Sequence, residues 1–193
     1  MIAIIDYGAG NVKSVENAVR NLGFEIVITS DFAEIRNAEK VIFPGVGEAS
    51  TAMKYLKEKN LDILIPTLKQ PFLGICLGQQ LLCDFSEEGN TQCLGIFDLK
   101  VKEFPATDIV PHMGWNNLQK IKGGLLKGIS TADNFYFVHS YYCETGEYTT
   151  SECDYILPFS ATLQKDNFYG TQFHPEKSGD IGSKILENFL KLK

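Results

Sequence analysis

The sequence predicts an α/β protein whose sheet is doubly wound, mostly parallel and flanked by helices, with antiparallel strands in the C-terminal half. Three observations predict this class. Short apolar runs alternate with segments of helical periodicity up to about residue 85, which is typical of a parallel sheet. Strand-like segments then follow one another with turns between them, which is typical of antiparallel pairing. The sequence shows no linker, repeat or low-complexity segment, so residues 1–193 are expected to form one domain.

The strands expected in the first half are four short apolar runs, IAIID, EIVIT, KVIF and PFLGI. Asn11 follows the first run and is a favoured N-cap residue, and the apolar residues after it return at helical spacing on one face. Pro44 and Gly45 should end the third strand, and Pro66 should break the segment LDILIPTLK. The helices expected between these strands span residues 12–22, 32–37, 49–59 and 77–85.

The second half is expected to contain a series of strands separated by turns. Several of them should pair antiparallel or extend the sheet. The last segment should be an amphipathic helix over residues 181–192, because Ile181, Ile185 and Phe189 fall on one stripe. The strand sequences are LKVKEF, GWNNLQ, FYFVHSYY, EYTTSE, SATLQ and FYGTQF.

Composition and charge exclude several classes of protein. The net charge is −6 and the lysines and arginines are scattered, so neither a nucleic acid nor an anionic membrane is an expected partner. No apolar run approaches the roughly 18–20 residues of a spanning helix, and the N-terminus lacks the features of a signal peptide, so a cytoplasmic protein is expected. The 5 cysteines are odd in number and show no C-x-x-C spacing, which argues against a disulfide framework or a zinc site.

One cysteine stands where a strand should turn sharply into a helix. The segment Gly74–Gly78, G-I-C-L-G, has the pattern of a nucleophile elbow with Cys76 in place of serine. Glycines on either side lack a Cβ and relieve the crowding of such a turn. At the start of a helix, free N–H groups and the helix dipole favour a thiolate and an oxyanion beside it. The alternative interpretation of Cys76 is a buried cysteine in a tight turn.

A cysteine nucleophile needs a base, and the sequence has 3 histidines. His174 is the favoured base, because Pro175 keeps it out of the helical region and Glu176 would point the same way in extended backbone. Together with the elbow cysteine, this pair gives the order nucleophile, base and orienting carboxylate. The alternative is a loop histidine beside a solvated glutamate. His139 lies in an aromatic strand and should be packed and hydrogen-bonded, and His112 ranks below His174 as a base.

A glycine-rich turn follows the third expected strand. In FPGVGEA, Gly45 and Gly47 flank Val46, and such turns let backbone N–H groups approach a ligand closely. With the N–H of Leu77, this turn could supply the donors of an oxyanion hole. Taken alone, the turn is more simply an ordinary connection between a strand and a helix.

Two of these motifs, GICLGQQ and QFHPEKS, resemble those of the class I (triad-type) glutamine amidotransferases. Four further segments, IIDYGAGNVKSV, FPGVGEA, PHMGWN and FYFVHSYY, are similar to the glutaminase subunits of imidazole glycerol phosphate synthase, in histidine biosynthesis. The resemblance covers nearly the whole chain. It implies a flavodoxin-like fold and a reaction that releases ammonia from glutamine, with no cofactor and no metal.

The resemblance also implies roles for individual residues. Cys76 would attack the side-chain amide of glutamine, His174 would transfer protons, and Glu176 would orient His174. Other residues would contact the oxyanion or the amide and amino-acid head of the substrate. These are Gly45, Val46, Gly47, Leu77, Gln80, Glu88, Ser140 and Tyr141.

A partner follows from the same resemblance. The ammonia would pass to a separate cyclase subunit, a (β/α)₈ barrel that makes imidazole glycerol phosphate and an aminoimidazole carboxamide ribotide. A heterodimer is therefore expected. Trp115 and Asn116 resemble interface residues of the family, and an exposed tryptophan near a methionine suits an anchor at an interface. The alternative for Trp115 is a core aromatic.

The chain departs from the family pattern outside the three catalytic positions. Gln79 stands where a methionine is expected, and Cys83 and Asp84 stand where an aromatic and another residue are common. Three other functions stay open: a subunit of a different amidotransferase complex, a stand-alone cysteine hydrolase with the same elbow, and a non-enzymatic relative. The segment PHMGWN disfavours the first, and the presence of all three catalytic residues disfavours the last.

Overall fold

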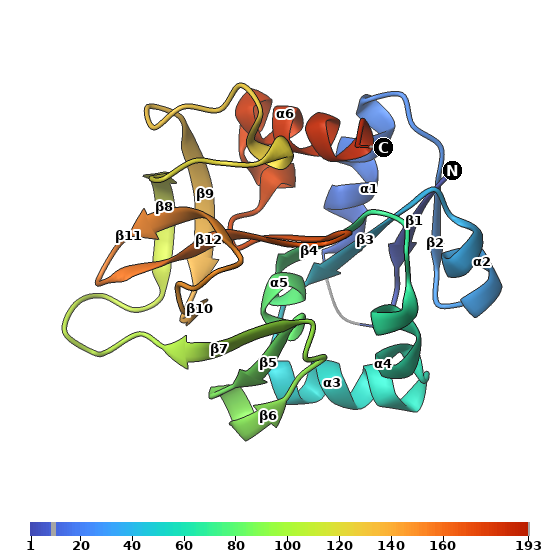
Figure 1. Cartoon of the computed structure of the whole chain (residues 1–193), viewed down its shortest axis with the longest axis horizontal. Coiled ribbons are helices and arrows are strands. Elements are labelled where there is room, and N and C mark those ends of the chain that lie inside the picture. Colours follow the sequence, from blue (N-terminus) through green and yellow to red (C-terminus); the bar gives the residue numbers. More distant parts are fainter. Residues whose placement is uncertain (9–10, 193) are drawn as a thin grey trace.

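The computed structural model describes residues 1–8 and 11–192, and a seven-stranded sheet forms its centre (Figure 1). The strand order is β11-β12-β13-β4-β3-β1-β2. Neighbouring strands from β13 to β2 run parallel, whereas β12 is antiparallel to β11 and β13, so the expected fold class is confirmed. The strands are β1 (Ile2–Ile5), β2 (Ile26–Thr29), β3 (Lys40–Gly45), β4 (Phe72–Cys76), β11 (Thr149–Asp154), β12 (Pro158–Lys165) and β13 (Phe168–Thr171).

Helices cover both faces of this sheet. Figure 1 shows α1 and α6 over one face, α3, α4 and α5 on the other side, and α2 beside the edge strand β2. Within the described part of the chain, no helix has the length and apolar character needed to cross a membrane. The helices are α1 (Val12–Asn21), α2 (Phe32–Asn37), α3 (Ala49–Glu58), α4 (Leu61–Leu64), α5 (Leu77–Leu81) and α6 (Gly179–Leu190), and the short 3₁₀ turns are η1 (Ile65–Thr67), η2 (Glu88–Asn90), η3 (Gly124–Leu126) and η4 (Pro175–Lys177).

Two smaller sheets flank the central one. The first has the order β10-β7-β5-β6, and the second pairs β8 with β9 antiparallel. The segment FYFVHSYY thus forms two strands in different sheets, with Ser140 between them. These strands are β5 (Cys83–Ser86), β6 (Thr91–Gln92), β7 (Phe97–Glu103), β8 (His112–Asn117), β9 (Asn134–His139) and β10 (Tyr141–Cys143).

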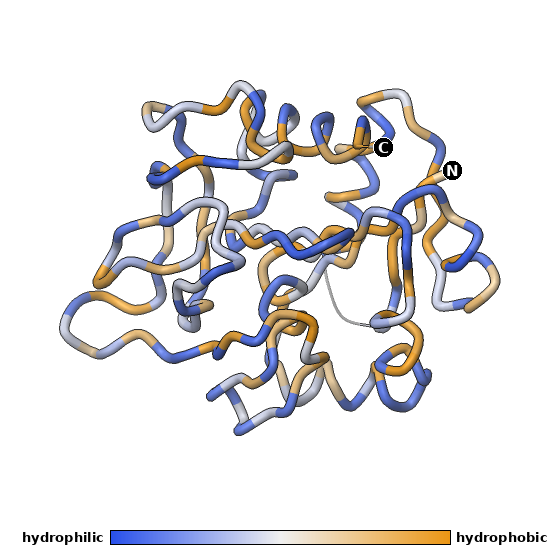
Figure 2. The backbone as a smooth tube through the Cα atoms, viewed as in Figure 1, coloured by the Kyte–Doolittle hydropathy of each residue, from blue (hydrophilic) through white to orange (hydrophobic). Residues whose placement is uncertain are grey.

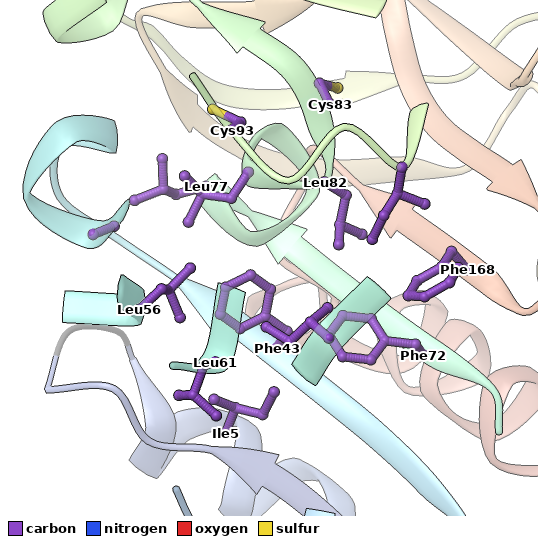
Figure 3. Packing of buried hydrophobic residues seen from close by; sticks show 14 of the residues in the cluster. Ile5, Phe43, Leu56, Leu61, Phe72, Leu77, Leu82, Cys83, Cys93 and Phe168 are labelled. Atoms are coloured by element: carbon purple, nitrogen blue, oxygen red, sulfur yellow. The ribbon is translucent and has the colours of Figure 1, made fainter. Parts of the chain in front are cut away.

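Two apolar clusters hold the layers together, one on each face of the sheet. Along β1, Ile2 and Ile4 belong to the cluster that includes α1 and α6, whereas Ala3 and Ile5 belong to the other. Figure 3 shows the second cluster, in which the rings of Phe43 and Phe72 lie 5.8 Å apart. Because the central strands are buried on both faces, most of their residues are apolar, and Figure 2 shows β1 as a hydrophobic stretch.

The end of β3 differs from the expectation, because the strand continues through Pro44 and Gly45. At these residues β3 pairs with β4 alone: Pro44 lies opposite Ile75 and Gly45 opposite Cys76, while the pairing with β1 has already ended at Ile42. Proline is tolerated where one side of a strand has no neighbour. The extension brings the glycine-rich turn level with the end of β4.

Three helix predictions are corrected in detail. The helix expected over residues 77–85 ends at Leu81, because residues 83–86 pair with β6 and β7 as β5 instead. Asn11 precedes α1, but its side chain accepts a hydrogen bond from Ser14 Oγ at 2.8 Å rather than capping a backbone N–H. The last helix runs from Gly179 to Leu190. In the segment IIDYGAGNVKSV, residues 9 and 10 lie outside the described residues.

Candidate active site

The expected elbow is present at the end of β4. Cys76 has φ 55° and ψ −112°, a backbone conformation that costs a non-glycine residue roughly 1–3 kcal/mol unless the surroundings impose it. Close packing imposes it here. A Cβ on Gly74 would lie 2.7 Å from the backbone of Gly78, and a Cβ on Gly78 would lie 2.0 Å from the Phe43 carbonyl oxygen. Both glycines are therefore required by the elbow, as the sequence indicates.

The helix after Cys76 is shorter than expected. α5 has 5 residues, so it offers free N–H groups at its first turn but only a small macrodipole. The helix dipole is therefore a smaller contribution at this site than the sequence suggests.

A cavity of about 320 Å³ lies beside Cys76. It contains most of the residues that the sequence predicts for the site, although they come from the ends of five strands (β3, β4, β5, β9 and β13), the loops after them and helix α5. Val138, His139 and Lys177 also line it and were not among the predicted substrate contacts. The predicted residues in its wall are Val46, Gly47, Cys76, Leu77, Gln80, Glu88, Ser140, Tyr141 and His174.

His174 and Glu176 form a buried pair next to this cavity. Nδ1 of His174 lies 2.8 Å from Oε1 of Glu176, and both side chains are almost fully buried. Pro175 holds His174 in extended backbone, as expected, but Glu176 lies in the 3₁₀ turn η4. The carboxylate therefore reaches the imidazole through a turn and not through the extended i, i+2 geometry. Its second oxygen, Oε2, is buried without a hydrogen-bond partner among the described residues.

The electrostatics favour a charged imidazole. Burial lowers the pKa of His174, but hydrogen bonds and charge interactions with Cys76 and Glu176 outweigh burial and raise the pKa to about 10. Cys76 and Glu176 thus both face the ring and favour its charged form. The remaining imidazole nitrogen, Nε2, is the one left for the thiol side, because Nδ1 faces the carboxylate.

Gln172 is a site residue that the sequence reasoning missed. Its side chain is fully buried, and its Nε2 lies 3.7 Å from Cys76 Sγ, close enough to donate to the sulfur. Gln80 Nε2 donates to Gln172 Oε1 at 2.9 Å and to the Tyr141 carbonyl at 2.9 Å. A signal was available, because Gln172 precedes His174 by two residues in the motif QFHPEKS.

In the glycine-rich turn, Gly45 is packed against the elbow, whereas Val46 and Gly47 line the cavity. Gly45 lies against the elbow, since a Cβ there would come within 2.5 Å of the Gly78 nitrogen, and it is not in the cavity wall. Val46 is 37% exposed and lines the cavity together with Gly47, whose φ is 100°. Position 45 therefore needs a glycine because its backbone lies close to the elbow, and not because it approaches a ligand.

Glu88 reaches the cavity from η2. One carboxylate oxygen accepts the N–H of Ala49, the first residue of α3, at 2.8 Å. Burial raises the pKa of Glu88. The side chain therefore has one oxygen fixed by a helix terminus, which orients the carboxyl group at the edge of the cavity.

The two predicted interface residues lie on β8, away from the cavity wall. Trp115 is 58% exposed and Met113, on the same strand, is 63% exposed. The exposure of Trp115 contradicts the alternative of a core aromatic. Asn116 is half-buried, and its Nδ2 donates to the Asp154 carbonyl at 3.0 Å.

Comparisons with known proteins show the family to which the chain belongs. Residues 3–192 match the family described as glutamine amidotransferase class-I. The chain is 57% identical over 194 residues to the imidazole glycerol phosphate synthase subunit HisH of Bacteroides fragilis and 54% identical to that of Bacteroides thetaiotaomicron, covering 99% of both chains in each case. It is 44% identical to the HisH subunit of Vibrio cholerae, over 99% of this chain and 98% of the relative.

Solved structures show the same fold. A glutamine amidotransferase has a TM-score of 0.76 at 17% identity, over 99% of this chain and 98% of that one. A glutamine amidotransferase from Thermotoga maritima has a TM-score of 0.65 at 17% identity, over 98% of this chain and 81% of that one. The solved structures show the fold alone, whereas the full-length identity to the curated relatives also shows the subfamily. The chain is therefore an enzyme of the class-I glutamine amidotransferase family and belongs, within it, to the HisH subunits of imidazole glycerol phosphate synthase.

Proposed function

We propose that this chain hydrolyses glutamine to glutamate and ammonia, with Cys76 as nucleophile, His174 as acid and base, and Glu176 as the residue that orients His174. One observation carries the proposal: a strained elbow cysteine and a buried His–Glu pair meet at a single cavity. This is the arrangement that nucleophilic acyl transfer needs.

The first half-reaction forms a thioester. The Cys76 thiolate attacks the side-chain amide carbon of glutamine, and the carbonyl oxygen becomes an oxyanion. We assign the N–H of Leu77 and an N–H of the Val46–Gly47 turn as the donors to that oxygen, because these residues line the cavity beside Cys76. His174 Nε2 gives its proton to the departing nitrogen, the C–N bond breaks, and ammonia leaves.

The second half-reaction restores the enzyme. The neutral imidazole of His174 takes a proton from water, which attacks the thioester carbon. The C–S bond then breaks, and glutamate leaves with the Cys76 thiolate regenerated. Throughout, Glu176 Oε1 accepts from Nδ1 of His174 and keeps Nε2 directed at the reacting atoms.

The remaining wall residues suit an amino-acid substrate. The cavity volume of about 320 Å³ is at the low end of the usual range for ligand sites, roughly 300–1,000 Å³. The Glu88 carboxyl can accept from a substrate ammonium group, and Ser140, Tyr141 and Gln80 offer polar groups around the amide and the head of the substrate.

The ammonia is proposed to pass to a cyclase subunit, a (β/α)₈ barrel, in a cytoplasmic heterodimer that acts as the lyase of histidine biosynthesis. The relatives support a complex of this kind, because each is a subunit of imidazole glycerol phosphate synthase. The exposed Trp115 and Met113 of β8 offer an apolar contact for such a partner. Residues 1–193 act in it as one domain.

The test is glutamate release from glutamine, measured with and without the cyclase subunit. Cys76→Ser should abolish it, while synthesis from added ammonia by the complex should survive. A glutamine analogue with an electrophilic carbon should label Cys76, and the other four cysteines serve as internal controls in the same mass spectrum. Labelling at Cys83 instead, or hydrolysis of peptides without a preference for glutamine, would overturn the assignment.

A further inference from the structure

Two buried histidines outside the proposed catalytic group connect strand β8 to the cavity wall. His112 and His139 lie opposite each other in the β8–β9 ladder, and Nδ1 of His112 is 3.1 Å from Nε2 of His139. Nδ1 of His139 is 2.8 Å from the Tyr141 carbonyl. At the other end, Nε2 of His112 is 3.4 Å from Nδ2 of Asn116. The three contacts form one chain from β8 to β10.

The Tyr141 carbonyl and the Asn116 amide fix the donor and acceptor of every hydrogen bond in this series. The Tyr141 carbonyl can only accept, so His139 must carry its proton on Nδ1. A neutral His139 then accepts at Nε2, which requires a proton on Nδ1 of His112. The neutral His112 in turn accepts at Nε2 from Asn116, whose amide orientation is set because its Nδ2 donates to the Asp154 carbonyl and its Oδ1 accepts the N–H of Asn117.

The surroundings keep both rings neutral. His112 stacks on Tyr155 with ring centroids 4.1 Å apart and on Phe137 with centroids 4.9 Å apart. Burial lowers the pKa of His112 to about 4 and that of His139 to about 3. A proton added to His139 would go to Nε2 and place two N–H groups against each other at the His112–His139 contact. A proton added to His112 would go to Nε2 and do the same against the Asn116 amide. Neutral rings with the fixed tautomers are therefore the arrangement that satisfies every donor and acceptor.

The chain continues beyond Tyr141 to the nucleophile. The Tyr141 carbonyl accepts a second hydrogen bond, from Gln80 Nε2 at 2.9 Å. The other hydrogen of that amide goes to Gln172 Oε1, and Gln172 Nε2 faces Cys76 Sγ at 3.7 Å. The Tyr141 carbonyl thus accepts from both His139, which connects it to β8, and Gln80, which connects it to the Cys76 thiol through Gln172.

We propose that the His112–His139 pair positions the nucleophile: it holds the Tyr141 carbonyl, and through Gln80 and Gln172 this carbonyl sets the alignment of Cys76. The outer end of the chain lies on the strand that carries the exposed Met113 and Trp115. A partner that docks on β8 and shifts it would therefore change the hydrogen bonds of the nucleophile. The effect on turnover rests on the proposed glutaminase function, whereas the series of hydrogen bonds from Asn116 to Cys76 does not depend on that function.

The first test is the protonation of the two rings in the isolated chain. Two-bond ¹H–¹⁵N correlation spectra at neutral pH should show His112 and His139 neutral and protonated at Nδ1. A ring protonated at Nε2, or an imidazolium, would overturn the proposal, because no such form satisfies the chain. This readout does not depend on any enzymatic activity.

The second test compares two identical charge changes on adjacent residues of β8. Asn116→Asp replaces the donor that faces His112 by an acceptor, so the series of hydrogen bonds from β8 to Tyr141 is interrupted at its outer end. Asn117→Asp is the matched control, because Asn117 only accepts from Gln119 Nε2 at 3.3 Å and touches neither histidine. With the cyclase at saturating concentration, Asn116→Asp should lose about 10- to 100-fold in kcat with little change in KM, the loss expected of a misaligned nucleophile.

Two readouts keep the test decisive if Asn116→Asp folds poorly. His112→Phe preserves the stacking and removes the chain, whereas His112→Asn keeps a donor near the Nδ1 position and should restore part of the kcat. The alkylation rate of Cys76 in the isolated chain should fall in His112→Phe and recover partly in His112→Asn. Equal kcat and alkylation in all variants would overturn the proposal. If the wild type fails to hydrolyse glutamine, the proposed function fails, and the tautomers and alkylation rates still decide this inference.

Discussion

The strain at Cys76 should be measurable as a loss of stability. Its ψ of −112° lies outside the left-handed region, where ψ is about +30° to +60°, so the upper part of the usual 1–3 kcal/mol cost applies. Glycine adopts this conformation freely but costs about 0.5–1 kcal/mol through unfolded-state entropy. Cys76→Gly should therefore be about 1–2 kcal/mol more stable than Cys76→Ala, since both variants lose the thiol equally.

Urea denaturation of the isolated chain measures this difference, and each kcal/mol should also raise Tm by about 2–4 °C for a domain of this size. Lys54, exposed in the middle of α3, is the control site. There the glycine variant should be less stable than the alanine variant by about 1 kcal/mol. If Cys76→Gly were also less stable than Cys76→Ala, the elbow would store no strain in solution.

Three further outcomes are expected. Glu176→Gln should lose less glutaminase activity than His174→Ala, because removing an orienting residue usually costs less than removing the base, and wild-type turnover by Glu176→Gln would exclude an orienting role. The pKa of His174 is lowered by burial but raised overall to about 10 by Cys76 and Glu176, so its contribution to stability should be complete below its ordinary value of 6.5 and lost as pH rises through about 10. Denaturation curves across that range should show the decline. A decline of the same size in Cys76→Ala would mean that the loss of stability does not come from the interaction of His174 with Cys76. Trp115→Ala should weaken activation by the cyclase subunit without changing turnover by the isolated chain, and an unchanged titration with cyclase would remove Trp115 from the interface.

The elbow was predictable because its cause is local. Gly74, Cys76 and Gly78 lie within five consecutive residues, and the steric demand of the turn leaves few other residues possible at those positions. The alternation of apolar runs and helical segments predicted the parallel sheet, because burial on both faces makes the central strands mostly apolar.

The features that the sequence did not predict depend on distant contacts. Gln172 faces Cys76 across 96 positions of the chain, so its role became visible only with the two side chains in place. Residues 83–86 have helical periodicity but pair as β5, because a neighbouring strand outweighs local preference. Glu176 reached His174 through a 3₁₀ turn that the extended-backbone argument did not include.

The two sides of the proposed oxyanion hole differ in rigidity, and this difference indicates how a partner could control turnover. Leu77 follows an elbow that close contacts with Gly45, Gly74 and Phe43 hold in place. Val46, in contrast, is 37% exposed and precedes Gly47 at φ 100°, so the peptide between them can reorient at low steric cost. Losing one oxyanion donor costs roughly 10²–10³-fold in kcat, enough to keep an isolated subunit nearly inactive.

Control through this peptide has a kinetic consequence. The donor acts on charge that develops only in the transition state, so the cyclase subunit should raise kcat more than it lowers KM. Val46→Gly should leave glutamine binding intact while it changes the ratio of activated to basal turnover, because it alters the freedom of the peptide and no catalytic side chain. Steady-state kinetics with and without the cyclase measure that ratio. Full turnover by the isolated chain, unchanged by the cyclase, would mean that the oxyanion hole is already complete and that the partner exerts no control through this turn.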